Sequence, residues 1–94
     1  MHLEWLEDIL AIAQTGSFGG AAEKRHLTQS AFSRRIKQIE QHVGVELFDR
    51  SHKPVVLRAT TLAQSEQIGQ IAATLRQLVI DLRRGDRIVN NKIV

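Results

Sequence analysis

The segment from Thr28 to Val43 has the period of an α-helix and two faces of opposite character, and it limits the possible folds more than any other segment. Apolar residues recur at intervals of four, three and four: Phe32, Ile36, Ile39 and Val43. Residues at the same spacing on the opposite face carry hydroxyl, guanidinium, ammonium and amide groups and no carboxylate: Ser30, Arg34, Lys37 and Gln41. Thr28 suits an N-cap and Gly44 a C-terminal stop. We therefore expect a helix that packs one face on a small core and offers the other to an anionic, hydrogen-bonding partner. DNA is the leading candidate.

The charge distribution favours the same kind of partner. The net charge is only +3, but residues 1–22 carry three acids and no Lys or Arg, whereas residues 23–58 carry eight Lys and Arg against four acids. A basic centre is typical of a nucleic-acid-binding protein, although solvated surface helices show the same pattern.

Other classes of function find little support. The chain has no cysteine, which excludes disulfides, thiolate metal sites and thiol catalysis. We find no constellation of nucleophile, base and acid and no glycine-rich phosphate loop, so we expect no enzyme activity. No apolar run is long enough to span a bilayer and no signal-peptide pattern is present. The histidines lack the spacing of metal ligands, so we expect no metal and no other cofactor: His2, His26, His42 and His52.

Two shorter helices are expected before this segment. The first spans Leu3 to Gln14 and ends near Thr15-Gly16, with Leu6, Ile9, Leu10 and Ala13 inside and with Glu7 and Asp8 outside. Ser17 suits the N-cap of a second helix, Phe18 to Arg25, which Gly19 and Gly20 weaken. A turn of about three residues then leads into the third helix. This order is the helix-turn-helix pattern, over about residues 18–37.

A basic hairpin is expected after the third helix. Two short apolar runs, residues 45–48 and 55–57, flank a polar loop that contains Arg50, His52, Lys53 and the only proline. Such a hairpin could reach the backbone or the minor groove of DNA as a wing, or it could be a solvated turn.

From residue 59 the pattern changes to heptads. Apolar residues repeat at three, four, three and four: Ile68, Ile71, Leu75, Leu78 and Leu82. We expect a long helix that ends near Gly85. Its narrow apolar seam must pack on a second copy of the chain or on the first helix of the same chain. Residues 86–94 lack an apolar period, and we expect them to begin a hinge to a further domain.

These residues resemble the N-terminal domain of LysR-type transcriptional regulators. The resemblance covers residues 3–84 and rests on an ordered set of motifs: Gly16-Ser17-Phe18, Ala21-Ala22-Glu23, residues 27–34, Ile39-Glu40 and residues 44–50. It implies a mainly α fold, in which a winged helix-turn-helix (residues 1–58, three helices plus a small β-hairpin wing) precedes a dimerising linker helix (residues 59–85). It also implies a bacterial, cytoplasmic regulator that binds promoter DNA as a homodimer, with tetramers possible in longer members. A small-molecule effector would bind only to a domain beyond this chain.

Three positions depart from the pattern of the family. Ser30 replaces a common proline, Gly19-Gly20 is looser than usual, and Arg58 to Thr61 replaces the usual threonine and glycine, which leaves the capping residue of the linker helix undetermined. None of these departures removes the basic face.

Resemblance and side-chain chemistry together assign roles to individual residues. Four residues in the first turns of the third helix are expected to read bases: Gln29, Ser30, Ser33 and Arg34. Three are expected at phosphates: Thr28, Arg35 and Lys37. Arg50, His52 and Lys53 are the wing candidates. A structural salt bridge is the alternative role for Arg35, and pairing with a nearby acid is the alternative role for Arg50. The four aromatic residues lie on apolar faces, so we expect them in the core rather than as stacking platforms for bases: Trp5, Phe18, Phe32 and Phe48.

Two other functions remain open from sequence. One is a non-specific architectural DNA-binding protein, and the other is a protein–protein module built on the heptad helix.

Overall fold

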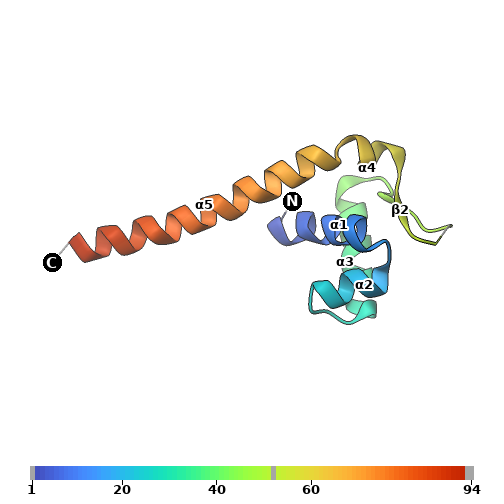
Figure 1. Cartoon of the computed structure of the whole chain (residues 1–94), viewed down its shortest axis with the longest axis horizontal. Helices are drawn as coiled ribbons and strands as arrows, with labels where there is room; N and C mark the ends of the chain where they lie inside the picture. The colour runs from blue at the N-terminus through green and yellow to red at the C-terminus, as the bar shows by residue number, and fades with distance from the viewer. Residues whose placement is uncertain (1, 52, 93–94) are drawn as a thin grey trace.

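The computed structural model describes residues 2–51 and 53–92, in which five helices and one two-stranded antiparallel sheet form a compact head and a long projecting helix (Figure 1). The elements are α1 (Leu3–Thr15), α2 (Phe18–Lys24), α3 (Gln29–Val43), β1 (Phe48–Asp49), β2 (Val56–Leu57), α4 (Ala59–Ala63) and α5 (Ser65–Lys92). The mainly α winged helix-turn-helix followed by a long helix is thereby confirmed.

Local signals place the ends of the first three helices where the sequence predicts them. Gly16 ends α1 and Gly44 ends α3, with φ of 72° and 90° respectively, which is the left-handed conformation that glycine adopts without a steric penalty. Ser17 begins α2, and its hydroxyl accepts a hydrogen bond of 2.9 Å from the N–H of Gly20. Between α2 and α3, His26 also has a positive φ, of 59°.

The core lies where α1, α2, α3 and the base of the wing meet. Its buried members are Ile9, Ala11, Ile12, Ala21, Ala22, Phe32, Ile36, Ile39, Leu47 and Phe48. Phe18 packs edge-on against both Phe32 and Phe48, with ring centroids 6.1 and 6.3 Å apart. Trp5 is also packed against this cluster, so the prediction that the aromatic residues belong to the core is confirmed.

Three predicted side-chain positions are wrong. Ala13 is exposed while Ala11 is buried, and Val43 keeps 42% of its surface exposed because the core ends one turn earlier, at Ile39. Asp8, expected on the outside of α1, is completely buried. Its burial is explained by two arginines described below.

The wing is a short hairpin that is tied to the helices at its base. β1 pairs with β2 in antiparallel register, Phe48 opposite Leu57 and Asp49 opposite Val56. The N–H of Val55 donates a hydrogen bond of 2.8 Å to the carbonyl of Gly16, so the wing is joined to the end of α1. The predicted hairpin is confirmed.

The predicted linker helix is interrupted at its start and extended at its end. A short helix, α4, precedes α5, and Gln64 between them has φ of −102° and ψ of 2°, which breaks the regular helix. Arg58 is the N-cap of α4 and makes no capping side-chain bond. The expected end near Gly85 is wrong, since α5 continues to Lys92 and Gly85 has no positive φ. The boundaries of the domains, 1–58, 59–85 and 86–94, stay predictions.

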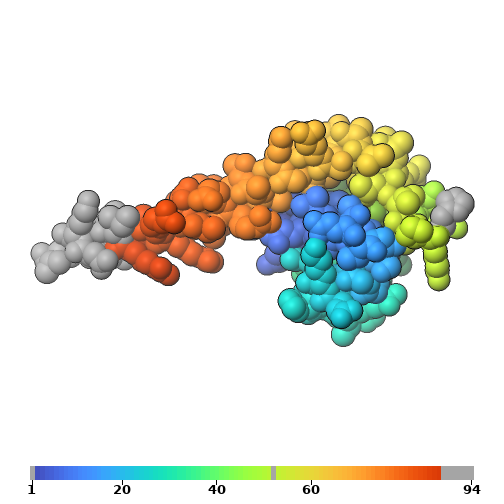
Figure 2. Space-filling view, in the orientation of Figure 1, coloured from blue at the N-terminus to red at the C-terminus, as the bar shows by residue number. Residues whose placement is uncertain are grey.

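α5 leaves the head and gives the molecule its elongated shape, 60 × 28 × 22 Å between Cα extremes (Figure 2). Only its first turns pack on α1, where Ala72 is fully buried and Ile68 contacts the core. Ile71, within this stretch, remains 43% exposed, and further along Leu78 and Leu82 remain 50% and 64% exposed. The seam is therefore partly covered by α1, and its outer half is left uncovered by the described part of the chain.

Candidate nucleic-acid interface

The exposed start of α3 carries the residues that were predicted to read bases. Thr28 caps the helix, and its hydroxyl accepts a hydrogen bond of 3.2 Å from the N–H of Ala31. Gln29, Ser30 and Arg34 are exposed and Ser33 is half-buried. A Cβ built on Gly19 would lie 3.4 Å from Oε1 of Gln29, an ordinary contact distance, so the Gln29 side chain lies beside the start of α2. The structure brings these four side chains together on one and a half turns.

Arg34 and Lys37 form the free cationic part of this surface. Both are exposed on α3, and neither makes an ion pair with any residue in the described ranges. The one acid of α3, Glu40, is turned toward the wing: its Oε2 accepts a hydrogen bond of 2.8 Å from the N–H of Leu47. The outer face of α3 therefore has positive charge that the head does not neutralise.

Arg35 points the other way and pairs with Asp8 of α1. Its Nε donates to Oδ2 of Asp8 at 2.6 Å and its Nη2 donates to Oδ1 at 2.9 Å, a bidentate arrangement. The hydrogen bonding of the Arg35 guanidinium to the Asp8 carboxylate, which accepts, raises the pKa of Arg35 above its ordinary value. The geometry favours the structural alternative for Arg35 and not the predicted phosphate contact.

Asp8 is a functional residue that the sequence prediction missed. It is inaccessible to solvent and also accepts a hydrogen bond of 2.8 Å from Nε of Arg25, so two guanidinium groups from α2 and α3 neutralise one carboxylate of α1. Trp5, Asp8 and Ile12 recur at three and four, which places Asp8 on an apolar stripe. That spacing was a usable signal for its burial.

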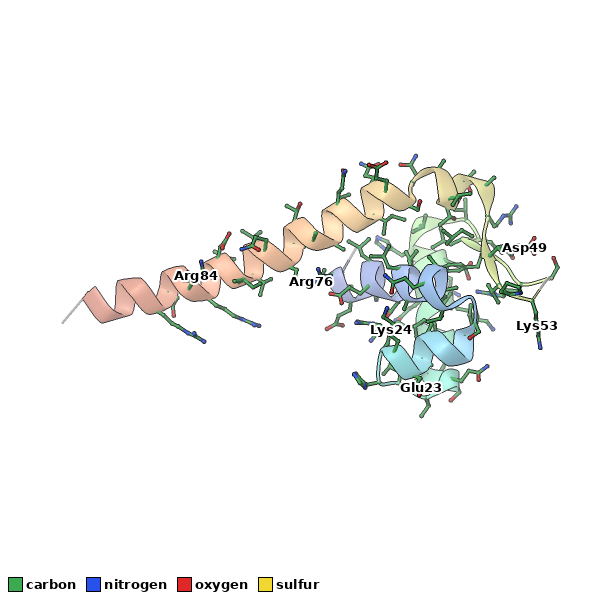
Figure 3. The ribbon with its side chains drawn as sticks, in the orientation of Figure 1. Glu23, Lys24, Asp49, Lys53, Arg76 and Arg84 are labelled. Atoms are coloured by element: carbon green, nitrogen blue, oxygen red, sulfur yellow. The ribbon has the colours of Figure 1, made fainter. Side chains whose placement is uncertain are left out.

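The wing, like α3, carries one basic residue that is paired with an acid, Arg50, and one that is exposed, Lys53. Nη2 of Arg50 pairs with Oε1 of Glu40 at 2.7 Å, and the guanidinium lies 5.0 Å from the ring centroid of Phe18. This geometry favours the structural alternative for Arg50. Lys53 is exposed beside the tip of the hairpin and points away from the head (Figure 3). His52 lies outside the described residues.

Membrane-spanning helices and metal-binding clusters are both absent from the described ranges. None of their helices is long and apolar enough to cross a membrane, and they contain no group of three or more His, Cys, Asp or Glu placed to hold a metal ion.

Comparisons with known proteins agree with this geometry. The sequence model of a family described as "Bacterial regulatory helix-turn-helix protein, lysR family" matches residues 3–64. The chain is 37% identical over 93 residues to the HTH-type transcriptional regulator YjiE of Escherichia coli K12, which aligns 99% of this chain and 31% of that protein. The chain thus spans about a third of the length of that relative.

Solved structures with the same fold include complexes with DNA. DarR of Vibrio fischeri, crystallised with DNA, matches with a TM-score of 0.86 and 33% identity over 94% of this chain and 30% of that one. A complex of the CbnR DNA-binding domain with DNA matches with a TM-score of 0.70 and 29% identity, over 98% of this chain and 99% of that one.

Proposed function

The chain belongs to the lysR family of bacterial regulatory helix-turn-helix proteins, and from this premise we propose that it binds promoter DNA in a sequence-specific manner, as a dimer, to regulate transcription. One observation carries the proposal. The arginines of the head divide into Arg25, Arg35, Arg50 and Arg58, which pair with acids of the head, and Arg34, which pairs with no acid of the described ranges. Arg34 and Lys37 thus leave an uncompensated positive face on the helix that such a fold inserts into the major groove.

Base reading falls to the first turns of α3. Arg34 can donate to O6 and N7 of guanine together, and Gln29 can pair with N6 and N7 of adenine. The hydroxyls of Ser30 and Ser33 accept or donate and tolerate more than one base. Support comes from their exposure and from their shared position at the start of α3.

Phosphate binding falls to Lys37, to Lys53 on the wing and to the N-terminal turn of α3 at Thr28. A lysine ammonium suits a phosphate as a point charge, and the free N–H groups at a helix N-terminus favour anions. Arg35 and Arg50 would support this surface from within, through Asp8 and Glu40. His52 stays a predicted wing contact.

Dimerisation falls to α5. The uncovered seam residues Ile71, Leu78 and Leu82 lie on a helix that leaves the head, so a second copy of α5 is the partner that would bury them. Beside them, a hollow of about 380 Å³ between α1 and α5 is lined by Leu6, Ile68, Ile71 and Leu75 and could receive an apolar side chain of that copy. In this arrangement residues 1–58 bind DNA, residues 59–85 join two chains, and residues beyond 85 lead toward an effector-binding domain. We place the protein in the bacterial cytoplasm, where promoter DNA is found.

The affinity for specific DNA relative to random DNA tests this function. We expect at least a thousandfold preference for a selected site at physiological salt, the lower end of the range of about 10³–10⁷ for specific regulators. A ratio near one would instead identify a non-specific architectural protein. No DNA binding at low salt, with dimerisation intact, would identify a protein–protein module.

A further inference from the structure

A continuous series of ion pairs joins α5 to the recognition helix α3 through α1 and α2. Nη2 of Arg76 on α5 lies 3.7 Å from Oε1 of Glu7, and Oε2 of Glu7 accepts a hydrogen bond of 3.1 Å from Arg25. Arg25 also pairs with Asp8, and Asp8 pairs with Arg35 on α3. We call these five residues the charge chain. Figure 3 shows Arg76 on the side of α5 that faces α1.

The charge chain is balanced when Glu4 is counted with it, and it is most buried at Asp8, between Arg25 and Arg35. Glu4 lies 4.0 Å from Nη1 of Arg35, so three acids (Glu4, Glu7 and Asp8) face three arginines. Side-chain exposure falls from 51% at Arg76 to 26% at Glu7, 21% at Arg25 and zero at Asp8. The carboxylate of Asp8 is therefore desolvated and held by charge-assisted hydrogen bonds from Arg25 and Arg35, whereas the contact of Arg76 with Glu7 at the outer end is half exposed.

The position of this outer contact gives it a geometric consequence. α5 packs on the head only in its first turns, around Ile68 and Ala72, and Arg76 lies one turn beyond Ala72. Apolar packing around this short stretch holds α5 against the head, but it only weakly restrains rotation of α5 relative to the head. A charged contact at the outer edge of the stretch limits that rotation. In a dimer joined through α5, the angle between α5 and α3 sets the separation of the two recognition helices.

We propose that the charge chain Arg76–Glu7–Arg25–Asp8–Arg35 fixes the angle between α5 and α3 and so selects the spacing between the two half-sites of the DNA. Glu7 and Arg76 act here as positioning residues: they contact no base and set where the base-reading residues stand. This inference rests on the proposed function of the chain as a dimeric DNA-binding protein. Arg34 reads which bases are present, and the charge chain determines how far apart they are read.

The test is a binding competition among DNA duplexes. Each duplex carries the same two half-sites, which are selected beforehand with the unaltered protein, and the duplexes differ only in the length of the spacer between the half-sites. The unaltered protein should enrich one spacing sharply. Arg76→Gln keeps the length and polarity of the side chain but removes its charge, and it should reduce the preference for that spacing about two- to fivefold, the effect of a partly exposed ion pair. Binding to a duplex with a single half-site should not change, because no base-reading residue is altered.

Three further variants test the positioning role of the contact between Arg76 and Glu7. Glu7→Gln should broaden the spacing profile as Arg76→Gln does, and the double variant should be no broader than Glu7→Gln alone, because both remove the same contact. Arg84→Gln removes an equal charge from an exposed position of α5 without a pairing acid in the described ranges, and should leave the profile unchanged (Figure 3).

The outcomes distinguish a failure of the inference on half-site spacing from a failure of the proposed function. If Arg76→Gln and the unaltered protein give the same profile, or if Arg84→Gln broadens it equally, the charge chain does not set the spacing and the proposed function stands. If the unaltered protein enriches no half-site at all, the proposed function fails and this inference fails with it.

Discussion

Arg34 and Arg35 are neighbours in α3 with opposite environments. Arg34 is exposed and unpaired within the described part of the chain, whereas Arg35 is three-quarters buried and holds Asp8 with two hydrogen bonds. Sequence periodicity placed Arg34 on the outer face but left two roles open for Arg35. A helical phase gives the direction of a side chain, whereas the role of Arg35 depends on an acid 27 residues away.

Arg34→Ala should weaken specific binding by about 1–3 kcal/mol and relax base preference at one position of the site. The fold should be unaffected, since Arg34 makes no contact with the core. A binding-site selection with the variant measures the effect, and an unchanged base preference at every position would contradict the assignment.

Arg35→Ala should instead destabilise the fold, by about 3 kcal/mol, which is the low end for breaking a buried ion pair because Arg25 still partners Asp8. Chemical denaturation measures this loss, with Arg34→Ala as the matched control. The raised pKa of Arg35 means that its contribution to stability is complete below the unfolded-state pKa and is lost only as the pH rises through the higher folded-state value, in strong alkali. Equal stability of the two variants would refute the structural role of Arg35.

Lys53→Ala should weaken binding to all DNA sequences about equally and lower the slope of log affinity against log salt by about one, because one phosphate contact is lost. Titrations at several salt concentrations give this slope. Arg84→Ala, a cation removed from α5, is the control and should keep it. If Lys53→Ala also keeps the full slope, the wing does not touch the backbone.

Among the secondary-structure elements, those with local signals were predictable. Ser17, Thr28, Gly16 and Gly44 fix the ends of α1, α2 and α3 through hydrogen bonds within a few residues, so the sequence alone locates them. The course of the chain after Arg58 was predicted less well. The break at Gln64 has no glycine or proline to announce it, and Gly85 imitates a C-terminal stop without adopting a left-handed conformation.

The substitution Gly85→Ala tests whether Gly85 lies inside the helix or ends it in a left-handed conformation. In the interior of a helix, alanine is more stable than glycine by about 1 kcal/mol, and among the described residues a Cβ at Gly85 meets nothing within 4 Å apart from the backbone of its own helix. We therefore expect the variant to gain helical content and thermal stability, measured by circular dichroism. A loss of stability would indicate that Gly85 ends the helix with a positive φ, as the sequence first suggested.

For the molecule as a whole, the head and α5 depend on different kinds of contact. The head has its own core, and the sequence identified most of it because Phe32, Ile36 and Ile39 repeat at helical spacing. The seam of α5 was also visible as a repeat, but a repeat does not say which body covers it. The structure shows that Ile68 packs against the core of the head and that Leu78 and Leu82 are exposed, which is consistent with the proposed contact with a second copy of α5.

Leu78→Asp should convert the dimer to a monomer, because it would place a carboxylate in the apolar seam between two copies of α5. The head should remain folded, since Leu78 lies beyond the part of α5 that packs on α1. Light scattering over a range of concentrations measures the mass, and Gln77→Asp on the same helix is the control. A monomeric unaltered protein at high concentration would refute the seam as a dimer interface.

The most direct test of dimeric, sequence-specific binding is selection of bound sites from a pool of fully randomised duplexes. Such binding predicts enrichment of a near-palindrome, with two copies of one short half-site whose centres face the same side of the double helix, since two recognition helices in a symmetric dimer read them. Arg34→Ala in the same selection should lose one position of each half-site. A pool that stays random after repeated rounds, or that enriches a single half-site without its inverted partner, would contradict it.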